Sequence, residues 1–403
     1  MSQLFSKSPA LLGLAFRPFF LCGGVFSAIA IGLWISNLNG WLTFSPYGGS
    51  YFWHAHEMVF GFVCAIIAGF LLTAVQNWTG IPGIKGRALL VLFALWLTAR
   101  LALALNAPTL ISATLDLLFL PAVIFFLAKP VITIKQYRNL LFVPILLLMF
   151  VGNLVSHIAL WRGDLAMALQ GIYSAAWLVV MIMTILGGRI VPMFTANGSQ
   201  TARVNNIPAL EIATLGTTLF VVLCQASGVA KLMPTGVNFF ICLLAAGLQL
   251  WRVVRWRFWV TAKVPLLWSL HISFLFIPMM LLLLSIHYLA QAWPSLSVLP
   301  FVSYSTALHV LFVGAMANMI LAMMARVSLG HSGRPLIPAP LMSAAFLAIA
   351  LAALSRTLFI WLAPNASYWL LNATACLWLI AYGLFAIIYW PVLTRPRLDG
   401  KPG

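Results

Sequence analysis

Twelve long apolar runs, each about the length of a membrane-spanning helix, constrain this chain more than any other feature. Of its 403 residues, 63% are hydrophobic and only 7% are charged, whereas a soluble domain carries roughly 25% charged residues. About 20 apolar residues in a helix cross a hydrocarbon core of about 30 Å. Backbone polar groups in lipid need partners within their own segment. The runs therefore predict an all-α, polytopic membrane helix bundle.

Helix-breaking residues separate the apolar runs. Gly80-Ile81-Pro82-Gly83, Lys129-Pro130, Asn197-Gly198 and Gly330-His331-Ser332-Gly333 all fall between them. No connection is long enough to hold a soluble domain, so we expect residues 1–403 to form a single transmembrane domain. The predicted helices span residues 16–37, 52–76, 87–105, 109–128, 139–160, 166–187, 208–228, 235–252, 265–289, 300–327, 338–361 and 367–393.

The basic residues predict the orientation of the bundle. All but four of the 22 lysines and arginines fall on the side of the N-terminus. Loops rich in lysine and arginine stay in the cytoplasm, so we expect both termini to be cytoplasmic and the first helix to be retained. The net charge of +17 follows from this asymmetry. It does not indicate nucleic-acid binding, because the basic residues are scattered over short loops. The four exceptions are Arg100, Arg162, Lys231 and Arg356.

Seven histidines stand out in this apolar chain. Polar side chains are expensive at membrane depth without partners, and histidine is the commonest protein metal ligand. Five of them could converge in the outer half of the bundle, with His309 about 14 Å deep at 1.5 Å per residue. A second, inner metal site could involve His271 and His331. The five outer histidines are His54, His56, His157, His287 and His309.

The spacing of the histidines restricts how they could bind a metal ion. His54 and His56, in Trp53-His54-Ala55-His56-Glu57-Met58, point to nearly opposite faces of a regular helix. They can share a metal ion only if the helix begins after them. No two histidines are three or four residues apart, so a metal site must be assembled from different helices. For His157 taken alone, a hydrogen-bonded structural role is the simpler interpretation.

Charged residues at membrane depth also need partners. Four arginines near helix ends could each clamp a carboxylate, including a haem propionate, or could extend to the lipid headgroups. Asp116, in the middle of the fourth helix, needs a proton or a partner. Glu57 could take a proton from a bound substrate or pair with an arginine. The four arginines are Arg17, Arg100, Arg189 and Arg326.

Two segments of the sequence are weakly similar. Laying residues 56–80 over residues 309–333 without gaps aligns His56 with His309, Gly61 with Gly314, and Ile67 with Ile320. Both segments are predicted to run from outside to inside, and repeats are common in membrane folds. The number of identities is close to chance for this composition, so the sequence leaves an internal repeat open. The alignment ends with Thr79-Gly80 over Ser332-Gly333.

Several motifs together resemble the NnrS family, in order and over the whole chain. The motif at 321–335 carries Ser332 where the family pattern has threonine, a change that keeps the hydroxyl. The resemblance implies a bacterial inner-membrane protein with twelve helices that carries haem and copper and is linked to nitric oxide and nitrosative stress. The motifs are F-R-P-F-F at 16–20, W-H-A-H-E-M at 53–58, N-W-T-G at 77–80, G-G-R-I-V-P-M-F-T-A-N-G at 187–198 and L-A-M-M-A-R-V-S-L-G-H-S-G-R-P at 321–335.

The resemblance leaves the reaction, and whether one is catalysed, unspecified. We expect His56 and His309 to be haem or metal ligands, with His54 and His157 next, and the four arginines to be propionate or structural partners. The competing interpretations are a twelve-helix transporter of a small solute or metal, and an oxidase-like haem-copper enzyme. A transporter would need broken helices and a polar site at the midplane. An oxidase-like enzyme would normally show a histidine pair on one helix and an acid-rich proton channel.

Overall fold

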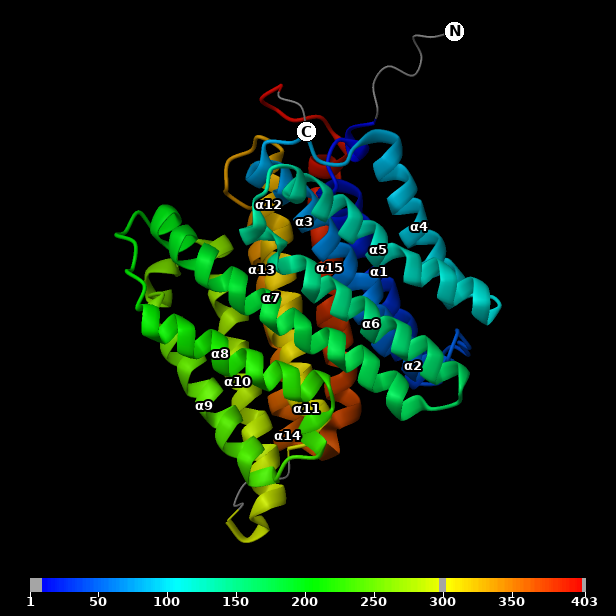
Figure 1. Cartoon of the computed structure of the whole chain (residues 1–403), viewed down its shortest axis with the longest axis vertical. Coiled ribbons are helices and arrows are strands. Elements are labelled where there is room, and N and C mark those ends of the chain that lie inside the picture. Colours follow the sequence, from blue (N-terminus) through cyan, green and yellow to red (C-terminus); the bar gives the residue numbers. More distant parts are fainter. Residues whose placement is uncertain (1–8, 297–301, 401–403) are drawn as a thin grey trace. The chain divides into compact units, whose positions relative to one another are not determined.

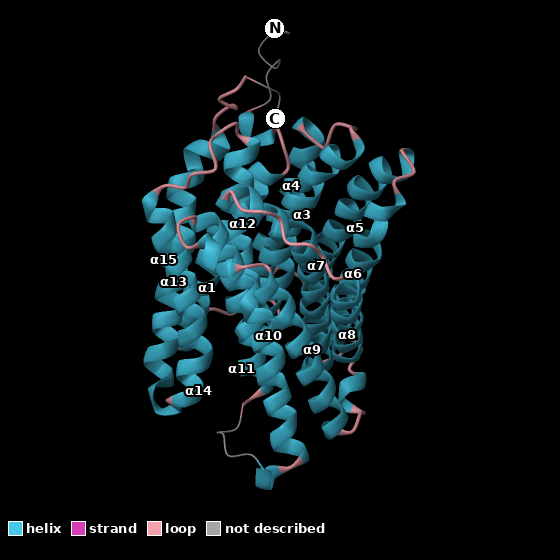
Figure 2. Cartoon of the chain, turned by 90° about the vertical axis from the view of Figure 1, so that its left-hand side faces the viewer, coloured by secondary structure: helices cyan, strands magenta, loops and turns pink. Residues whose placement is uncertain are grey.

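The computed structural model describes residues 9–296 and 302–400. Within these residues every regular element is a helix (Figure 2). Twelve helical stretches are long and apolar enough to cross a membrane. The prediction of an all-α polytopic membrane bundle is therefore confirmed.

The helices carry the labels of Figure 1, and three of the described spans contain a π-helix between α-helical parts. Those three spans are α2–η2–α3, α11–η7–α12 and α13–η8–α14. The elements are α1 (Phe16–Leu38), α2 (Gly49–His56), η2 (Glu57–Val63), α3 (Cys64–Thr79), α4 (Gly86–Ala104), α5 (Thr109–Thr133), α6 (Phe142–Trp161), α7 (Leu165–Ser199), α8 (Pro208–Ala226), α9 (Thr235–Arg255), α10 (Pro265–Ala292), α11 (Tyr304–His309), η7 (Val310–Ala317), α12 (Asn318–His331), α13 (Pro340–Leu354), η8 (Ser355–Phe359), α14 (Ile360–Leu362) and α15 (Ser367–Thr394).

The predicted boundaries are wrong at two breakers. Lys129-Pro130 lies inside α5, and Asn197-Gly198 lies inside α7, which continues to Ser199. Proline removes one backbone hydrogen bond but does not have to end a helix in a protein interior or in lipid, where neighbouring groups compensate. His331, expected in the turn after its helix, is the last residue of α12. The predicted start of that span at residue 300 lies outside the described residues.

The chain divides into two compact units. Unit 1 comprises Met1–Ala175, Met324–Ile337 and Tyr382–Gly403, and unit 2 comprises Ala176–Met323 and Pro338–Ala381. In unit 1, α2–η2–α3 is the central span: 78% of its most apolar window is buried, against 33% for α4 and for α5. Polar side chains on the central span are therefore withdrawn from both lipid and water. That a single transmembrane domain spans residues 1–403 remains a prediction.

The positive-inside prediction can be tested with single cysteines in a cysteine-free background. Arg162→Cys lies in the exposed turn after α6, and Leu398→Cys lies in the exposed segment after α15. We expect a membrane-impermeant maleimide added to spheroplasts to label the first variant, and to label the second only after the membrane is permeabilised. Labelling of Leu398→Cys in intact spheroplasts would contradict cytoplasmic termini.

Candidate metal centre

A π-helix begins immediately after a histidine in the central span of unit 1. His56 is the last residue of α2, and Glu57 is the first residue of η2. A π-helix widens the turn and changes the direction of side chains, and such turns often occur at functional sites. Here His56 and Glu57, although adjacent in sequence, contact the same polar cluster.

Gly61 leaves space for this cluster. A Cβ atom on Gly61 would lie 2.8 Å from Nη1 of Arg100 and 2.9 Å from Oε2 of Glu57. Neither of these groups can move without breaking its own contacts. Any side chain larger than hydrogen at position 61 would therefore displace the cluster.

Arg100 links two carboxylates from different helices. Its Nη1 donates to Oε1 of Glu57 at 2.7 Å, and its Nη2 donates to Oδ1 of Asp116. All three side chains are 2% exposed or less. A buried charge is tolerated only when it is paired and hydrogen-bonded. The arginine therefore fixes α4 and α5 against the π-helix of the central span.

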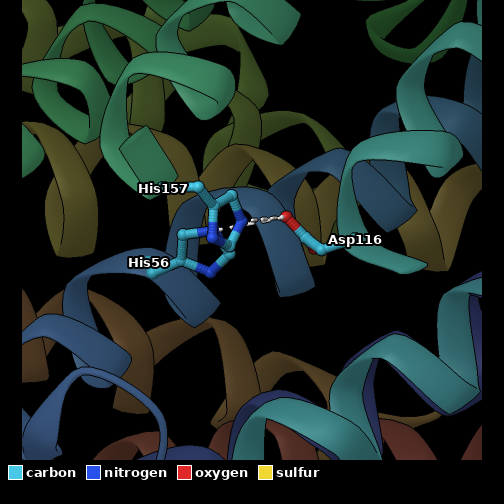
Figure 3. Close-up of side chains that lie close together, drawn as sticks. All are labelled: His56, Asp116 and His157. Atoms are coloured by element: carbon cyan, nitrogen blue, oxygen red, sulfur yellow. Dashed lines mark hydrogen bonds and ion pairs between the residues drawn. The ribbon is translucent and has the colours of Figure 1, made fainter. Parts of the chain in front are cut away.

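Two histidines meet at the other oxygen of Asp116 (Figure 3). Oδ2 of Asp116 lies 3.1 Å from Nε2 of His157 and 3.3 Å from Nε2 of His56. The two imidazole rings have centroids 5.2 Å apart. His157 comes from α6, so the cluster joins the side chains of four helical spans.

Both ring nitrogens of His56 face oxygen acceptors. Nδ1 lies 2.9 Å from Oε1 of Glu57, and Nε2 lies 2.9 Å from Oδ1 of Asn153. The amide of Asn153 is held in this orientation because its Nδ2 donates to Oδ2 of Asp116 at 2.6 Å. Nε2 also lies 3.3 Å from Oδ2 of Asp116, so the ring of His56 sits among three oxygen atoms.

His157 is held in one tautomer. Its Nε2 donates to Asp116, and its Nδ1 accepts from the hydroxyl of Tyr47 at 3.1 Å. Tyr47 lies in the loop before α2 and is buried. Burial raises the pKa of the Tyr47 hydroxyl above its ordinary value, which keeps that group a hydrogen-bond donor. Nε2 of His157, next to Asp116, is therefore the nitrogen nearest the centre of the cluster.

The cluster holds two carboxylates and one guanidinium. Glu57 and Asp116 share Arg100 as their cationic partner. An uncompensated buried ion is destabilising, so the second carboxylate requires either a bound proton or a further cation. Oε2 of Glu57 is buried without a hydrogen-bond partner among the described residues, so the cluster retains an unused negatively charged acceptor.

The donor set has metal-binding geometry. One ligand atom each from His56, Asp116 and His157 lie within 4.8 Å of one another. Ligand atoms about 2 Å from one metal ion are separated by roughly 3–4 Å, so a small closure would place all three on a common ion. Within the described residues this is the one such group of histidine, cysteine and carboxylate side chains.

His54 does not take part in the cluster. The helix begins at Gly49, before both histidines, so His54 and His56 point in different directions, as their spacing predicts. The ring of His54 stacks on Trp34 with centroids 4.5 Å apart. His54 therefore does not share a metal ion with His56 in this arrangement.

The other candidate histidines lie elsewhere and have their own partners. In unit 2, Nε2 of His271 lies 2.8 Å from Oγ1 of Thr195. His309 contacts Ser305 and Arg356. In unit 1, the ring of His331 packs 5.7 Å from that of Phe16. The inner pair proposed from the sequence, His271 and His331, is thus split between the two units.

Of the four candidate arginines, Arg100 alone is in the cluster. Arg17 is fully buried, and its Nη1 donates to the carbonyls of Leu393 and Arg395 at 2.9 and 2.8 Å. These bonds satisfy the C-terminal carbonyls of α15, which is a helix-capping role. Arg189 and Arg326 are partly buried on α7 and α12.

Sequence reasoning missed Asn153 and Tyr47. Asn153 lies one helical turn before His157 on α6, a spacing that places both on one face of a helix. An amide beside a histidine at membrane depth was the available signal. No sequence signal identified Tyr47, because its contact with His157 depends on how the loop before α2 folds back, with its N–H bonded to the carbonyl of Leu103.

Comparison with protein families agrees with this fold and with the motifs. The profile described as NnrS protein matches residues 10–397. The chain belongs to the NnrS family. A separate search among curated proteins found no match. The matched residues of this NnrS-family chain include His56, His157 and Arg100.

Removing the arginine tests whether the cluster is an interdependent charge network. Arg100→Met leaves two carboxylates buried with too little positive charge, so we expect a loss of roughly 3–5 kcal/mol of stability. The measurement is thermal unfolding of the purified protein in detergent. Arg162→Met, in an exposed turn, is the matched control and should change stability by no more than about 0.5 kcal/mol. Equal unfolding temperatures for the two variants would show that Arg100 is not part of such a network.

Proposed function

We propose that this protein is a haem- and copper-binding membrane protein that acts in the response to nitric oxide, by binding it, converting it or limiting its damage. Membership of the NnrS family supports the nitric oxide and metal connection. The observation that carries the proposal is the buried His56–Asp116–His157 cluster, in which one ligand atom from each side chain lies within 4.8 Å of the others.

Copper suits this cluster. Imidazole is a good ligand for copper, and two histidines with one carboxylate give a nitrogen-rich site. Asn153 would orient Asp116 from outside, as partners of metal ligands generally do. For Nε2 of His157 to bind the metal, the ring would take the other tautomer, with Nδ1 donating to the hydroxyl oxygen of Tyr47. When bound, the metal supplies a redox-active centre shielded from water. Arg100 keeps the two carboxylates in place whether the cation is a proton or a metal ion.

His309 is the candidate haem ligand in unit 2. Its Nδ1 donates to the backbone carbonyl of Ser305 at 2.7 Å, which puts the lone pair on Nε2, and Arg356 would have to move from that nitrogen for iron to bind there. A histidine that binds iron commonly donates its other nitrogen in this way. The ring of Phe312 packs 5.7 Å away and supplies an apolar neighbour. Arg356, with Nη2 at 3.3 Å from Nε2, brings a positive charge beside the same ring.

Nitric oxide suits a site of this kind. It is small, neutral and soluble in lipid, so it reaches a buried metal without a polar channel. Haem iron supplies the capacity to bind it when that group is present. The helices around the cluster exclude water and charged solutes, which favours a neutral ligand over an ionic one.

A transporter is the second candidate, because a specific feature favours it. Three described spans are interrupted by π-helices, and two of these, η2 and η7, begin directly after a histidine. Interrupted helices in corresponding positions often mark a transported solute's site. An oxidase-like enzyme is less well supported, since the two metal-site histidines lie on different helices, α2 and α6, and the carboxylates beside them are bound by Arg100.

Replacing each cluster histidine should remove copper. We expect His56→Ala and His157→Ala to lower copper per chain from about one to near zero, because each leaves too few ligands. Metal analysis of the purified, folded protein provides the measurement. His287→Gln is the control, since that buried histidine bonds the backbone carbonyl of Val302. Full copper in both cluster variants, or no copper in the unmodified protein, would defeat the assignment and leave the transporter.

His309→Ala tests the haem assignment separately. The variant should lose the Soret absorption of the purified protein while keeping its copper, because the two proposed sites use different side chains. His56→Ala should show the opposite pattern. A variant lacking His309 that retains the full haem spectrum would exclude this residue as the ligand.

Copper binding should weaken as the pH falls. Imidazole and carboxylate groups bind a metal ion only in their deprotonated forms, so protons compete with copper for these ligands at low pH. We therefore expect copper to be retained at neutral pH and lost progressively on acidification. Equilibrium dialysis over a pH series, with folding monitored by circular dichroism, gives the measurement. Copper retention that does not change with pH would show that no proton competes for the site.

A further inference from the structure

The similarity between the two histidine-containing spans extends beyond residues 56–80. Ser50-Tyr51 aligns with Ser303-Tyr304, and Pro82 aligns with Pro335, in the same gapless register. The next helix of each segment contains Arg-x6-Ala-Pro: Arg100 precedes Ala107-Pro108, and Arg356 precedes Ala363-Pro364. Each spacing from arginine to proline is identical, so the two segments correspond over two consecutive spans.

The structure has matching local features at these positions. α2 ends at His56 and α11 ends at His309, and a π-helix follows each histidine directly. Gly80 and Gly333 both have φ +71, the left-handed conformation that follows a helix end. A side chain from the preceding long helix packs on the matching tyrosine in both cases: Trp34 on Tyr51 at 6.3 Å, and His287 on Tyr304 at 6.0 Å. These agreements favour an internal repeat.

The arginines of the two segments have the same spacing to the Ala-Pro pair, although Arg100 is buried in α4 and Arg356 is partly buried within the π-helix η8. In unit 1, Arg100 and His56 both contact Oε1 of Glu57. In unit 2, Nη2 of Arg356 lies 3.3 Å from both ring nitrogens of His309, a direct contact between the corresponding residues. The histidine and the arginine are therefore brought together in both segments.

The carboxylates of unit 1 are replaced by neutral residues in unit 2. Val310 occupies the position of Glu57, and Asn372, at the same spacing after the Ala-Pro pair, occupies the position of Asp116. The remaining three carboxylates are used elsewhere. Glu211 pairs with Arg252, Asp399 pairs with Arg397, and Asp164 accepts from the N–H of Met167. The second segment thus keeps the basic residues of the first and lacks its acidic ones.

We propose that unit 2 carries a second polar site, centred on Arg356 and His309, whose charge is opposite to that of the first. The first site takes a cation, and the second takes a single carboxylate or a small oxyanion such as formate or nitrate. A guanidinium presents a planar pair of donors that matches such groups. His309 positions the guanidinium through its contact with Nη2. Two different molecules can supply this group. One is a free small anion. The other is haem bound through His309, with one propionate on Arg356, and this alternative rests on the proposed function.

The test is anion-dependent thermal unfolding of the full chain as purified in detergent. Sodium formate and sodium nitrate are titrated at constant ionic strength, with sodium gluconate as the bulky reference salt. For a free anion, we expect the apparent affinity for formate to fall about tenfold or more in Arg356→Gln, the loss expected for a charged hydrogen bond. Arg162→Gln, in an exposed turn, should respond like the unmodified protein.

Haem content of the same preparations distinguishes the sources. A formate response that is lost in Arg356→Gln, at unchanged haem content, supports a free anion. No formate response, with haem content lower in Arg356→Gln than in Arg162→Gln, supports a propionate. Unchanged formate response and unchanged haem content in Arg356→Gln would overturn the second site. The copper content of the unit 1 cluster is a separate readout, so its failure does not decide this outcome.

Restoring the carboxylates gives a test that keeps the arginine. Val310→Glu with Asn372→Asp recreates the acidic pair of unit 1, and an internal carboxylate should then occupy Arg356. We expect the double variant to lose the anion response or the haem, whichever the unmodified protein shows. Val310→Gln with Asn372 unchanged has the same volume as the double variant without its charge and should retain the response. Equal behaviour of these two variants would contradict the equivalence of the segments.

Discussion

The bridge from Arg100 to Glu57 and Asp116 is the interaction on which the rest of the site depends. Burying one carboxylate costs several kcal/mol unless it is paired, and two are buried here beside one guanidinium. The pairing joins the central span to α4 and α5, and Asp116 then holds the histidines of α2 and α6. Because one guanidinium faces two carboxylates, the second carboxylate needs a bound proton or, as we propose, a metal ion.

The π-helix explains how adjacent residues serve one cluster. On a regular α-helix His56 and Glu57 would diverge by about 100°, whereas in the observed geometry both contact each other and the groups around them. Gly61 allows the close approach of Arg100 that this geometry requires. The cost of a wider turn is recovered in the ion pairs, since the span is otherwise apolar and well buried.

Much of the fold could be predicted from the sequence, because lipid requires long apolar helices and the composition shows them directly. The lengths of the apolar runs predicted twelve spans. However, α5 and α7 continue past the prolines and glycines at which the sequence predicted a break. The site was harder to predict. The two-residue spacing predicted that His54 and His56 point to different faces of the helix. The position of Asp116 in mid-helix predicted that it needs a partner, but which arginine pairs with it depends on helix packing. The contact of His157 with Tyr47 depends on a loop conformation that no local pattern encodes.

The two segments that contain His56 and His309 show how one scaffold can serve two purposes. Both retain the histidine, the π-helix and the arginine in the next span, while the acidic residues differ. Changing the charge beside a fixed arginine changes the kind of ligand without changing the fold. The weak similarity between residues 56–80 and 309–333 became informative only when the π-helices and the glycine turns were found at corresponding positions.

The most direct test of the central claim is X-ray diffraction at the copper absorption edge from crystals of the protein purified with its native metals. The account predicts one anomalous peak in unit 1, about 2 Å from an imidazole nitrogen of His56 and of His157, with Asp116 turned toward it. A well-ordered cluster without an anomalous peak, or copper bound by residues elsewhere in the chain, would contradict it.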